Sequence, residues 1–179
     1  MSSFRAPGFA IRGCMDWYFD VVRAAGYTFD SSVPADRVGP PLKPAGGSGE
    51  FLVRTQTGLL VEVPVSSMGL MGSLAMPLGG GYLRLLPWSV LQRVSRQIRQ
   101  SGRPLVLYIH PRDVDPESPC LPLGPWRRFK FTVNRRSTLT KLHALLTRYD
   151  FTSIVDLNPS REERPARPSL PLAGLTRAG

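Results

Sequence analysis

The spacing of apolar positions predicts a chain built from helices that are each followed by a short apolar strand. The first helix runs from Cys14 to Ala25, with Tyr18 and Val22 on its apolar stripe and Gly26 as its end. A strand is predicted directly after it, at Tyr27 to Phe29.

Two later segments repeat this pattern. Pro87 stands in the first turn of a predicted helix that ends at Gly102, and the uninterrupted apolar run Leu105 to Ile109 predicts a strand covered on both faces. A last helix is expected with Ser137 as its N-cap, and a strand at Phe151 to Val155 follows it. Three such units favour an α/β fold with a parallel sheet or barrel, in which functional groups gather at the carboxyl ends of the strands.

Glycine- and proline-rich stretches divide the rest of the chain. Residues 33–49 are predicted to be a loop, and residues 59–65 return as a strand. The chain has 179 residues, of which 42% are hydrophobic, and this suffices for one core of ordinary size. We therefore expect one domain over residues 1–157. A disordered tail is expected over residues 158–179, because prolines alternate there with charged and small residues.

Composition excludes several classes of protein. With 17 glycines and 18 prolines the chain is no coiled coil. It has no apolar run of about eighteen residues and no signal-peptide pattern, so we expect a cytoplasmic protein without a membrane span. The two cysteines, Cys14 and Cys120, form neither a disulfide framework nor a paired zinc-ligand spacing.

The net charge of +10 is concentrated in the middle of the chain. Residues 84–148 contain thirteen basic and three acidic residues, and such a surface attracts anionic polymers. The arginines at helical spacing within this region have no aromatic residues between them to stack on bases. The pattern therefore disfavours nucleic acid as a partner.

Four residues could carry chemistry. His110 ends a predicted strand and suits a general acid or base, or a partner for a nearby carbonyl. Arg5 could hold a carboxylate with two parallel hydrogen bonds or could lie on the surface. Asp30 follows a predicted strand but equally fits the start of an ordinary turn. Glu62 lies among apolar residues, where its carboxylate must face solvent or find a partner.

Several short strings of residues carry a family resemblance through their order along the chain. They are Phe4-Arg5-Ala6-Pro7-Gly8-Phe9, Ala25-Gly26-Tyr27 with Asp30-Ser31-Ser32, Glu62-Val63-Pro64-Val65-Ser66, Gly79-Gly80-Gly81-Tyr82-Leu83-Arg84-Leu85-Leu86-Pro87, Tyr108-Ile109-His110-Pro111 with Asp115-Pro116, and Phe151-Thr152-Ser153-Ile154. In this order they resemble the C-terminal half of the polysaccharide deacetylases of extracellular-polysaccharide gene clusters. The resemblance covers roughly Phe4 to Leu157.

This resemblance implies a partial (β/α) barrel that lacks its N-terminal strands. It also implies a metal-dependent hydrolysis of N-acetyl groups on amino sugars, with a divalent metal, usually zinc, as the cofactor. Arg5 resembles the arginine that orients the catalytic aspartate, and His110 resembles the histidine that protonates the departing amine. Asp30 falls near a motif that shapes the acetyl pocket. Tyr82 and Arg84 resemble positions near the substrate rim, with no assigned role.

The chain departs from the family at its first two motifs. A Thr-Phe-Asp-Asp-Gly string would supply the base and one metal ligand, and a His-x-x-x-His string would supply two more ligands. Neither string is present, and the only histidines are His110 and His143. The chain therefore contains no metal site of this kind, and we expect a truncated or separately encoded half that is inactive alone.

The expected partners follow from this interpretation. They are an acetylated amino-sugar polysaccharide and either a second copy of the chain or an N-terminal half on another chain, since half a barrel would expose strand edges. Coding sequence upstream of Met1 would show whether the missing motifs are encoded there. The alternative is a non-catalytic basic module that uses residues 84–148 to bind anionic polysaccharide or nucleic acid.

Overall fold

The computed structural model describes residues 2–9, 11, 16–35, 49–69, 75–119 and 122–156. It contains two compact units, each considered by itself. The first unit comprises residues 1–77, 98–106 and 152–179, and the second comprises residues 78–97 and 107–151. The predicted tail over 158–179, most of the predicted loop over 33–49, and both cysteines lie outside the described residues.

A four-stranded mixed sheet forms the centre of the first unit, in the order β1-β2-β4-β3. Strands β1 (Ser3–Phe4), β2 (Phe29–Asp30) and β4 (Gly58–Glu62) are parallel, whereas β3 (Phe51–Thr55) runs antiparallel to β4. The predicted α/β class is confirmed. Among the described residues, however, the sheet is open and does not close into a barrel.

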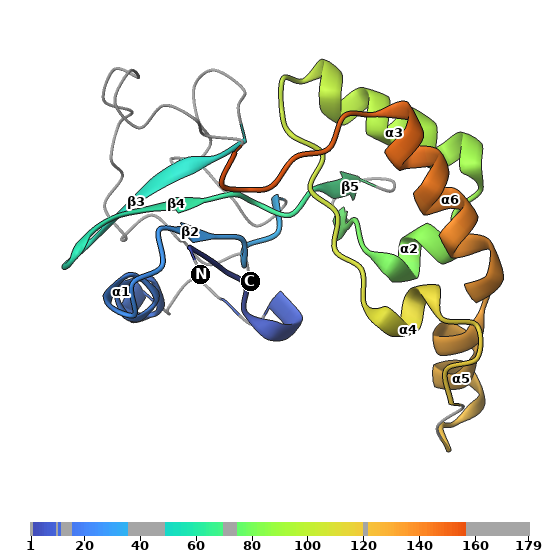
Figure 1. Ribbon diagram of the computed structural model, residues 1–179. Coiled ribbons are helices and arrows are strands. Elements are labelled where there is room, and N and C mark those ends of the chain that lie inside the picture. Colours follow the sequence, from blue (N-terminus) through green and yellow to red (C-terminus); the bar gives the residue numbers. More distant parts are fainter. Residues whose placement is uncertain are drawn as a thin grey trace. The chain divides into compact units, whose positions relative to one another are not determined.

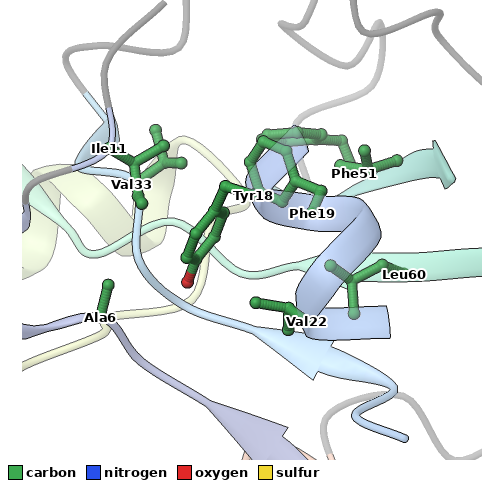
Figure 2. Packing of buried hydrophobic residues seen from close by; sticks show 9 residues of the cluster. Ala6, Ile11, Tyr18, Phe19, Val22, Val33, Phe51 and Leu60 are labelled. Atoms are coloured by element: carbon green, nitrogen blue, oxygen red, sulfur yellow. The ribbon is translucent and has the colours of Figure 1, made fainter. Parts of the chain in front are cut away.

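Helix α1 (Asp16–Ala24) covers one face of this sheet and packs on β3 and β4 (Figure 1). Its residues Tyr18, Phe19 and Val22 are buried, as a helical stripe of spacing three to four requires. They form the core together with buried side chains from the sheet and loops, which are Ala6, Ile11, Val33, Phe51, Val53 and Leu60 (Figure 2). Gly26 ends this region with a φ of 93°, a left-handed value that glycine adopts without strain.

Two smaller elements complete the first unit. A single 3₁₀ turn, η1 (Pro7–Phe9), follows β1, and strands β5 (Ser67–Gly69) and β6 (Ala75–Pro77) pair antiparallel. No helix among the described residues is long and apolar enough to cross a bilayer.

The second unit is helical. It contains α2 (Gly80–Leu85), most of α3 (Trp88–Gln100), α4 (Pro111–Val114), α5 (Pro125–Thr132) and α6 (Arg135–Arg148). Helices α2, α4 and α6 pack against one another (Figure 1). The predicted helix after Pro87 is confirmed as α3, and its apolar positions are buried, namely Leu91, Val94 and Ile98.

Two predicted strands are wrong. Residues 105–109 form no strand, only Val106 among them is buried, and the segment changes its backbone partner along its length. Ser66 N donates to Val106 O and Val106 N donates to Ser66 Oγ, whereas Tyr108 forms an isolated bridge with Gly79. Residues 151–155 form no strand either, because most of their side chains are exposed and the segment ends in a turn.

Predicted boundaries also shift. The strand expected over residues 59–65 is β4, which ends at Glu62. The strand expected at Tyr27 to Phe29 is β2, which starts at Phe29 and includes Asp30. The N-cap of α6 is Asn134 rather than Ser137. Asn134 adopts a left-handed φ of 51°, which asparagine tolerates better than most residues, and it turns the chain from α5 directly into α6.

Candidate functional site

The carboxyl ends of the three parallel strands of the first unit carry a cluster of polar residues. Arg5 directly follows β1, Asp30 is the last residue of β2 and Glu62 is the last residue of β4. The strand register pairs Phe4 with Asp30 and Asp30 with Glu62, so the three ends are level. Functional groups of parallel α/β folds gather at this edge of the sheet.

Arg5 is fixed by the residue that follows Asp30. Its Nε donates to the carbonyl oxygen of Ser31 at 2.8 Å, and its Nη2 donates to Ser31 Oγ at 2.7 Å. The Ser31 hydroxyl in turn donates to the carbonyl oxygen of Val63 at 2.7 Å, just beyond β4. A chain of hydrogen bonds therefore ties the guanidinium across all three parallel strand ends.

Asp30 is fully buried and accepts hydrogen bonds through one carboxylate oxygen. Its Oδ1 accepts from Ser32 Oγ at 2.8 Å and from Tyr18 Oη at 3.1 Å. Ser32 Oγ also accepts the backbone N–H of Ala6 at 2.8 Å. Burial raises the pKa of Tyr18, so the phenol stays neutral and acts as a donor.

Glu62 is also fully buried and uses one oxygen to hold the turn after β2. Its Oε1 accepts the backbone N–H of Ser32 at 3.1 Å and that of Val33 at 2.9 Å. Of the two alternatives predicted for Glu62, exposure to solvent or a polar partner, the structure shows the second, since the backbone N–H groups of Ser32 and Val33 are its partners.

The remaining oxygens of the two carboxyl groups define the charge state of this pair. Asp30 Oδ2 and Glu62 Oε2 are buried, and neither has another hydrogen-bond partner in the described part of the chain. Burial, first, and the neighbouring charge of Asp30 raise the pKa of Glu62 well above its usual range. We infer that the folded protein favours the protonated form of Glu62, because a second buried charge beside the Asp30 carboxylate is costly.

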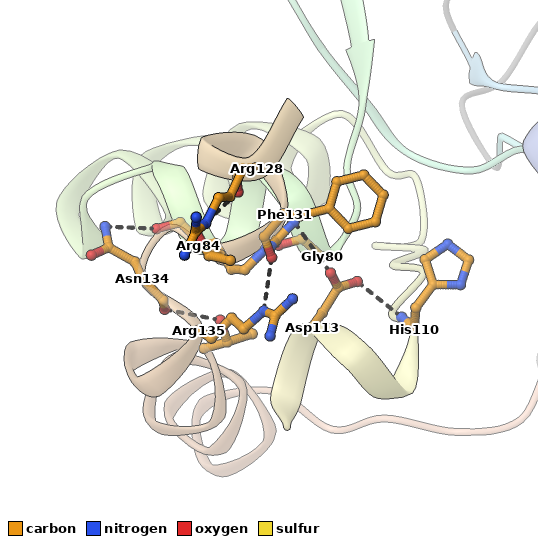
Figure 3. Close-up of polar contacts among 10 residues, drawn as sticks. Gly80, Arg84, His110, Asp113, Arg128, Phe131, Asn134 and Arg135 are labelled. Atoms are coloured by element: carbon orange, nitrogen blue, oxygen red, sulfur yellow. Dashed lines mark hydrogen bonds and ion pairs between the residues drawn. The ribbon is translucent and has the colours of Figure 1, made fainter. Parts of the chain in front are cut away.

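The second unit holds a different polar cluster around a buried ion pair. Arg84 Nη2 lies 3.3 Å from Asp113 Oδ1, and both side chains are buried. Burial lowers the pKa of Arg84 while the Asp113 carboxylate opposes this change. Asp113 Oδ2 accepts the backbone N–H of His110 at 3.0 Å, so one carboxylate fixes both Arg84 and the start of α4 (Figure 3).

The triple glycine before Tyr82 is explained by this cluster. A Cβ on Gly80 would lie 1.8 Å from Asp113 Oδ2, and a Cβ on Gly79 would lie 2.1 Å from the Tyr108 ring. Neither position can accept a side chain without moving its neighbours. Tyr82 itself is half-buried, and its burial raises its pKa.

His110 is the exposed member of the cluster. It is the N-cap residue of α4, and its ring packs edge to face against Tyr108 at a centroid distance of 5.8 Å. The following Pro111 and the hydrogen bond to Asp113 fix its backbone. The histidine therefore leads into a helix, and not out of a buried strand as the sequence predicted.

Basic residues of α6 hold the ends of α2 and α5. Arg135 Nε donates to the carbonyl oxygen of Phe131 at 2.8 Å, which also accepts from Arg84 Nη1 (Figure 3). Lys141 Nζ donates to three carbonyl oxygens at the end of α2, those of Leu83, Arg84 and Leu86. Its burial lowers its pKa. Part of the positive charge of residues 84–148 is thus structural, because it satisfies helix-end carbonyls.

The candidate residues from the sequence fall into two groups. Arg5 and Asp30 lie in the first unit and are joined through Ser31 and its neighbours, whereas Tyr82, Arg84 and His110 lie in the second unit. That Arg5 and His110 face one pocket stays a prediction.

The sequence did not identify Tyr18, Ser32 and Asp113 as parts of these clusters. Their contacts span turns and neighbouring strands, and the spacing of Asp113 three residues after His110 was the one local signal for a helix cap.

No group of three or more His, Cys, Asp or Glu side chains in the described ranges is arranged to hold a metal ion. The described residues thus contain no ligand set for the metal that the resemblance implies. A separate groove of about 390 Å³ lies in the second unit, lined by Trp88, His143, Ala144, Thr147 and Arg148. None of the candidate residues named from the sequence lines this groove.

Comparison with models of known protein families gives a match. Residues 31–158, more than two thirds of the chain, match the model of a family described as a domain of unknown function (DUF3473). The matched region includes Glu62, Asp113 and His110 and begins after Arg5 and Asp30. No curated protein and no solved structure matches the chain significantly.

Proposed function

The chain belongs to the DUF3473 family, whose domains often occur with polysaccharide deacetylase domains, and we propose that it forms one wall of a deacetylase site for acetylated amino-sugar polymers. The chain alone is inactive in this proposal. A second polypeptide segment, carrying the Thr-Phe-Asp-Asp-Gly and His-x-x-x-His strings, completes the site and the barrel.

The placement of Arg5 carries this proposal. Strand β1 is one edge of the described sheet, and Arg5 directly follows it. A further parallel strand beside β1 would lie about 4.8 Å away and would end at the same edge. A carboxylate at the end of that strand would then come within reach of the Arg5 guanidinium, which Ser31 already holds in place.

In the proposed deacetylation, two residues of this chain take part. Water adds to the acetamide carbonyl carbon, the C–N bond breaks, and the products are acetate and the free amine. Arg5 orients the carboxylate that accepts the proton of the water. His110 donates a proton to the departing amine nitrogen, a role that suits an exposed imidazole on a fixed backbone.

Acetate release from acetylated glucosamine oligomers tests this proposal. The chain should release none with added zinc, and it should gain activity when mixed or fused with a segment that carries the two missing motifs. In the completed protein, His110→Ala and Arg5→Ala should each lower kcat by roughly 10² to 10⁴-fold.

Matched controls are His143→Ala and Arg96→Ala, since both side chains are exposed and neither belongs to the two polar clusters. These variants should keep full activity. Zinc-dependent release by the chain alone, or full activity of His110→Ala in the completed protein, would overturn the proposal.

A further inference from the structure

Helix α5 presents two large aromatic side chains to solvent. Trp126 is 66% exposed and Phe129 is 48% exposed, and none of the eight residues of the helix is buried. Their spacing of three residues places both rings on one side of the helix, where they stack with centroids 5.8 Å apart and planes at 14°. Exposed apolar surface of this kind marks an interaction site.

Cations surround the aromatic pair. Arg127, Arg128 and Lys130 are exposed on the same helix, and the Lys130 ammonium lies 4.9 Å from the centre of the Trp126 ring. There is no acidic residue between Arg127 and Arg148 in the sequence, so no carboxylate on α5 or α6 neutralises them. The partner of this surface therefore carries negative charge next to an apolar phase.

The C-terminal end of α5 is held by hydrogen bonds, while Trp126 and Phe129 are exposed to solvent. The carbonyl oxygen of Phe131, in the last turn, accepts hydrogen bonds from Arg84 and Arg135, which fix this end to the rest of the unit. The helix lies beyond α4 at one end of the second unit (Figure 1). Trp126 and Phe129 can thus meet an extended surface without rearrangement of the helices behind them.

We propose that α5 docks the protein onto an anionic phospholipid surface. Trp and Phe at the level of the headgroups, flanked by Arg and Lys, are the side chains that interfacial helices use. A sugar or a nucleobase would need a free aromatic face for stacking, and here Trp126 already contacts Phe129 and Lys130. This docking concerns only α5 and is independent of the deacetylase site.

Cosedimentation with vesicles tests the proposal on the full chain. Binding to vesicles of equal parts phosphatidylcholine and phosphatidylglycerol should exceed binding to phosphatidylcholine alone and should fall with added salt. The double variant Trp126→Ala/Phe129→Ala should lose at least about tenfold in affinity, and each arginine removed from α5 should weaken binding roughly fivefold.

The control is the variant Arg93→Ala/Arg96→Ala on α3, which removes the same charge as Arg127→Ala/Arg128→Ala from exposed positions outside α5. It should bind vesicles more tightly than the α5 variant. Brominated lipid should quench the tryptophan fluorescence of the bound protein. The quenched part should be absent in the Trp126→Phe variant.

Three outcomes would overturn the proposal. They are equal binding to neutral and anionic vesicles, equal loss of binding in the α3 and α5 variants, and tighter binding of a soluble anionic polysaccharide or RNA through the same α5 residues.

Discussion

Asp30 and Glu62 face each other in register at the ends of two adjacent parallel strands, both fully buried and each with one carboxyl oxygen that has no other partner among the described residues. Glu62 holds the backbone of the turn that carries Ser32, and Ser32 bonds Asp30. Glu62 and Ser32 therefore tie the turn after β2 to the edge of the sheet on which Arg5 lies.

The first prediction concerns the pH dependence of stability. The pKa of Glu62 is raised in the folded state above its ordinary value of about 4.3, so the folded protein binds more protons than the unfolded chain between these two pKa values. The stabilisation is complete below the unfolded pKa and is lost as the pH rises through the folded pKa. Each unit of difference corresponds to about 1.4 kcal/mol.

Glu62→Gln should remove this pH dependence, because the amide keeps an acceptor for Ser32 and Val33 and does not titrate. Urea unfolding at a series of pH values measures the effect, with the exposed Glu117→Gln as the control that keeps the original slope. A Gln variant that still loses stability as the pH rises would show that the proton is held elsewhere.

The second prediction concerns the contribution of the Glu62 side chain to stability through its hydrogen bonds and packing, apart from its protonation. Glu62→Ala leaves the N–H groups of Ser32 and Val33 buried without their acceptor and creates a cavity. We expect a loss of roughly 2–5 kcal/mol in the free energy of unfolding at all pH values. Stability equal to that of the Gln variant would mean that these two hydrogen bonds contribute little.

The third prediction uses two neighbouring glycines. Gly80→Ala should destabilise the second unit by roughly 1–3 kcal/mol, since its Cβ would overlap the Asp113 carboxylate. Gly81→Ala is the matched control, because its Cβ would meet only Arg84 Nη2 at 3.9 Å. This variant should be more stable by about 0.5–1 kcal/mol, the usual gain from alanine in a helix. Thermal unfolding of both variants gives the comparison, and equal effects would contradict the close packing of Gly80.

The fourth prediction concerns the buried ion pair. Asp113→Ala removes the only ion-pair partner recorded for Arg84 among the described residues and also the acceptor for the His110 N–H. Breaking a buried pair in this way costs about 3–5 kcal/mol, because the remaining charge stays buried. The neighbouring exposed Asp115→Ala should cost less than about 1 kcal/mol in the same unfolding experiment. A small effect of Asp113→Ala would mean that Arg84 reaches solvent once the carboxylate is gone.

Local patterns in the sequence predicted the elements that bury a regular apolar stripe. Helices α1 and α3 were predicted because Tyr18 and Val22, or Leu91 and Val94, repeat at helical spacing before a glycine. The position of Asp30 at a strand end was also predictable. Its partnership with Glu62 was not, because it depends on the register between strands that are distant in the sequence.

The strand expected over residues 105–109 shows where such patterns fail. An apolar run of this length reads as a doubly buried strand, but the backbone of this segment pairs one residue at a time with Ser66 and then with Gly79. An apolar composition indicates that a segment is buried. It does not indicate which other segment of the chain forms backbone hydrogen bonds with it. The N-cap at Asn134 was also not predicted. Its left-handed backbone conformation does not change the spacing of apolar residues, which was the signal used to place the helix.

The shortness of β1 offers a way to observe assembly directly. With only Ser3 and Phe4 in the strand and, among the described strands, a neighbour on one side alone, its backbone amides should exchange hydrogen with heavy water soon after dilution. A companion segment that adds a strand here would slow that exchange locally. The labelling kinetics of this dipeptide thus provide a catalysis-independent readout of whether, and how tightly, the proposed second segment binds.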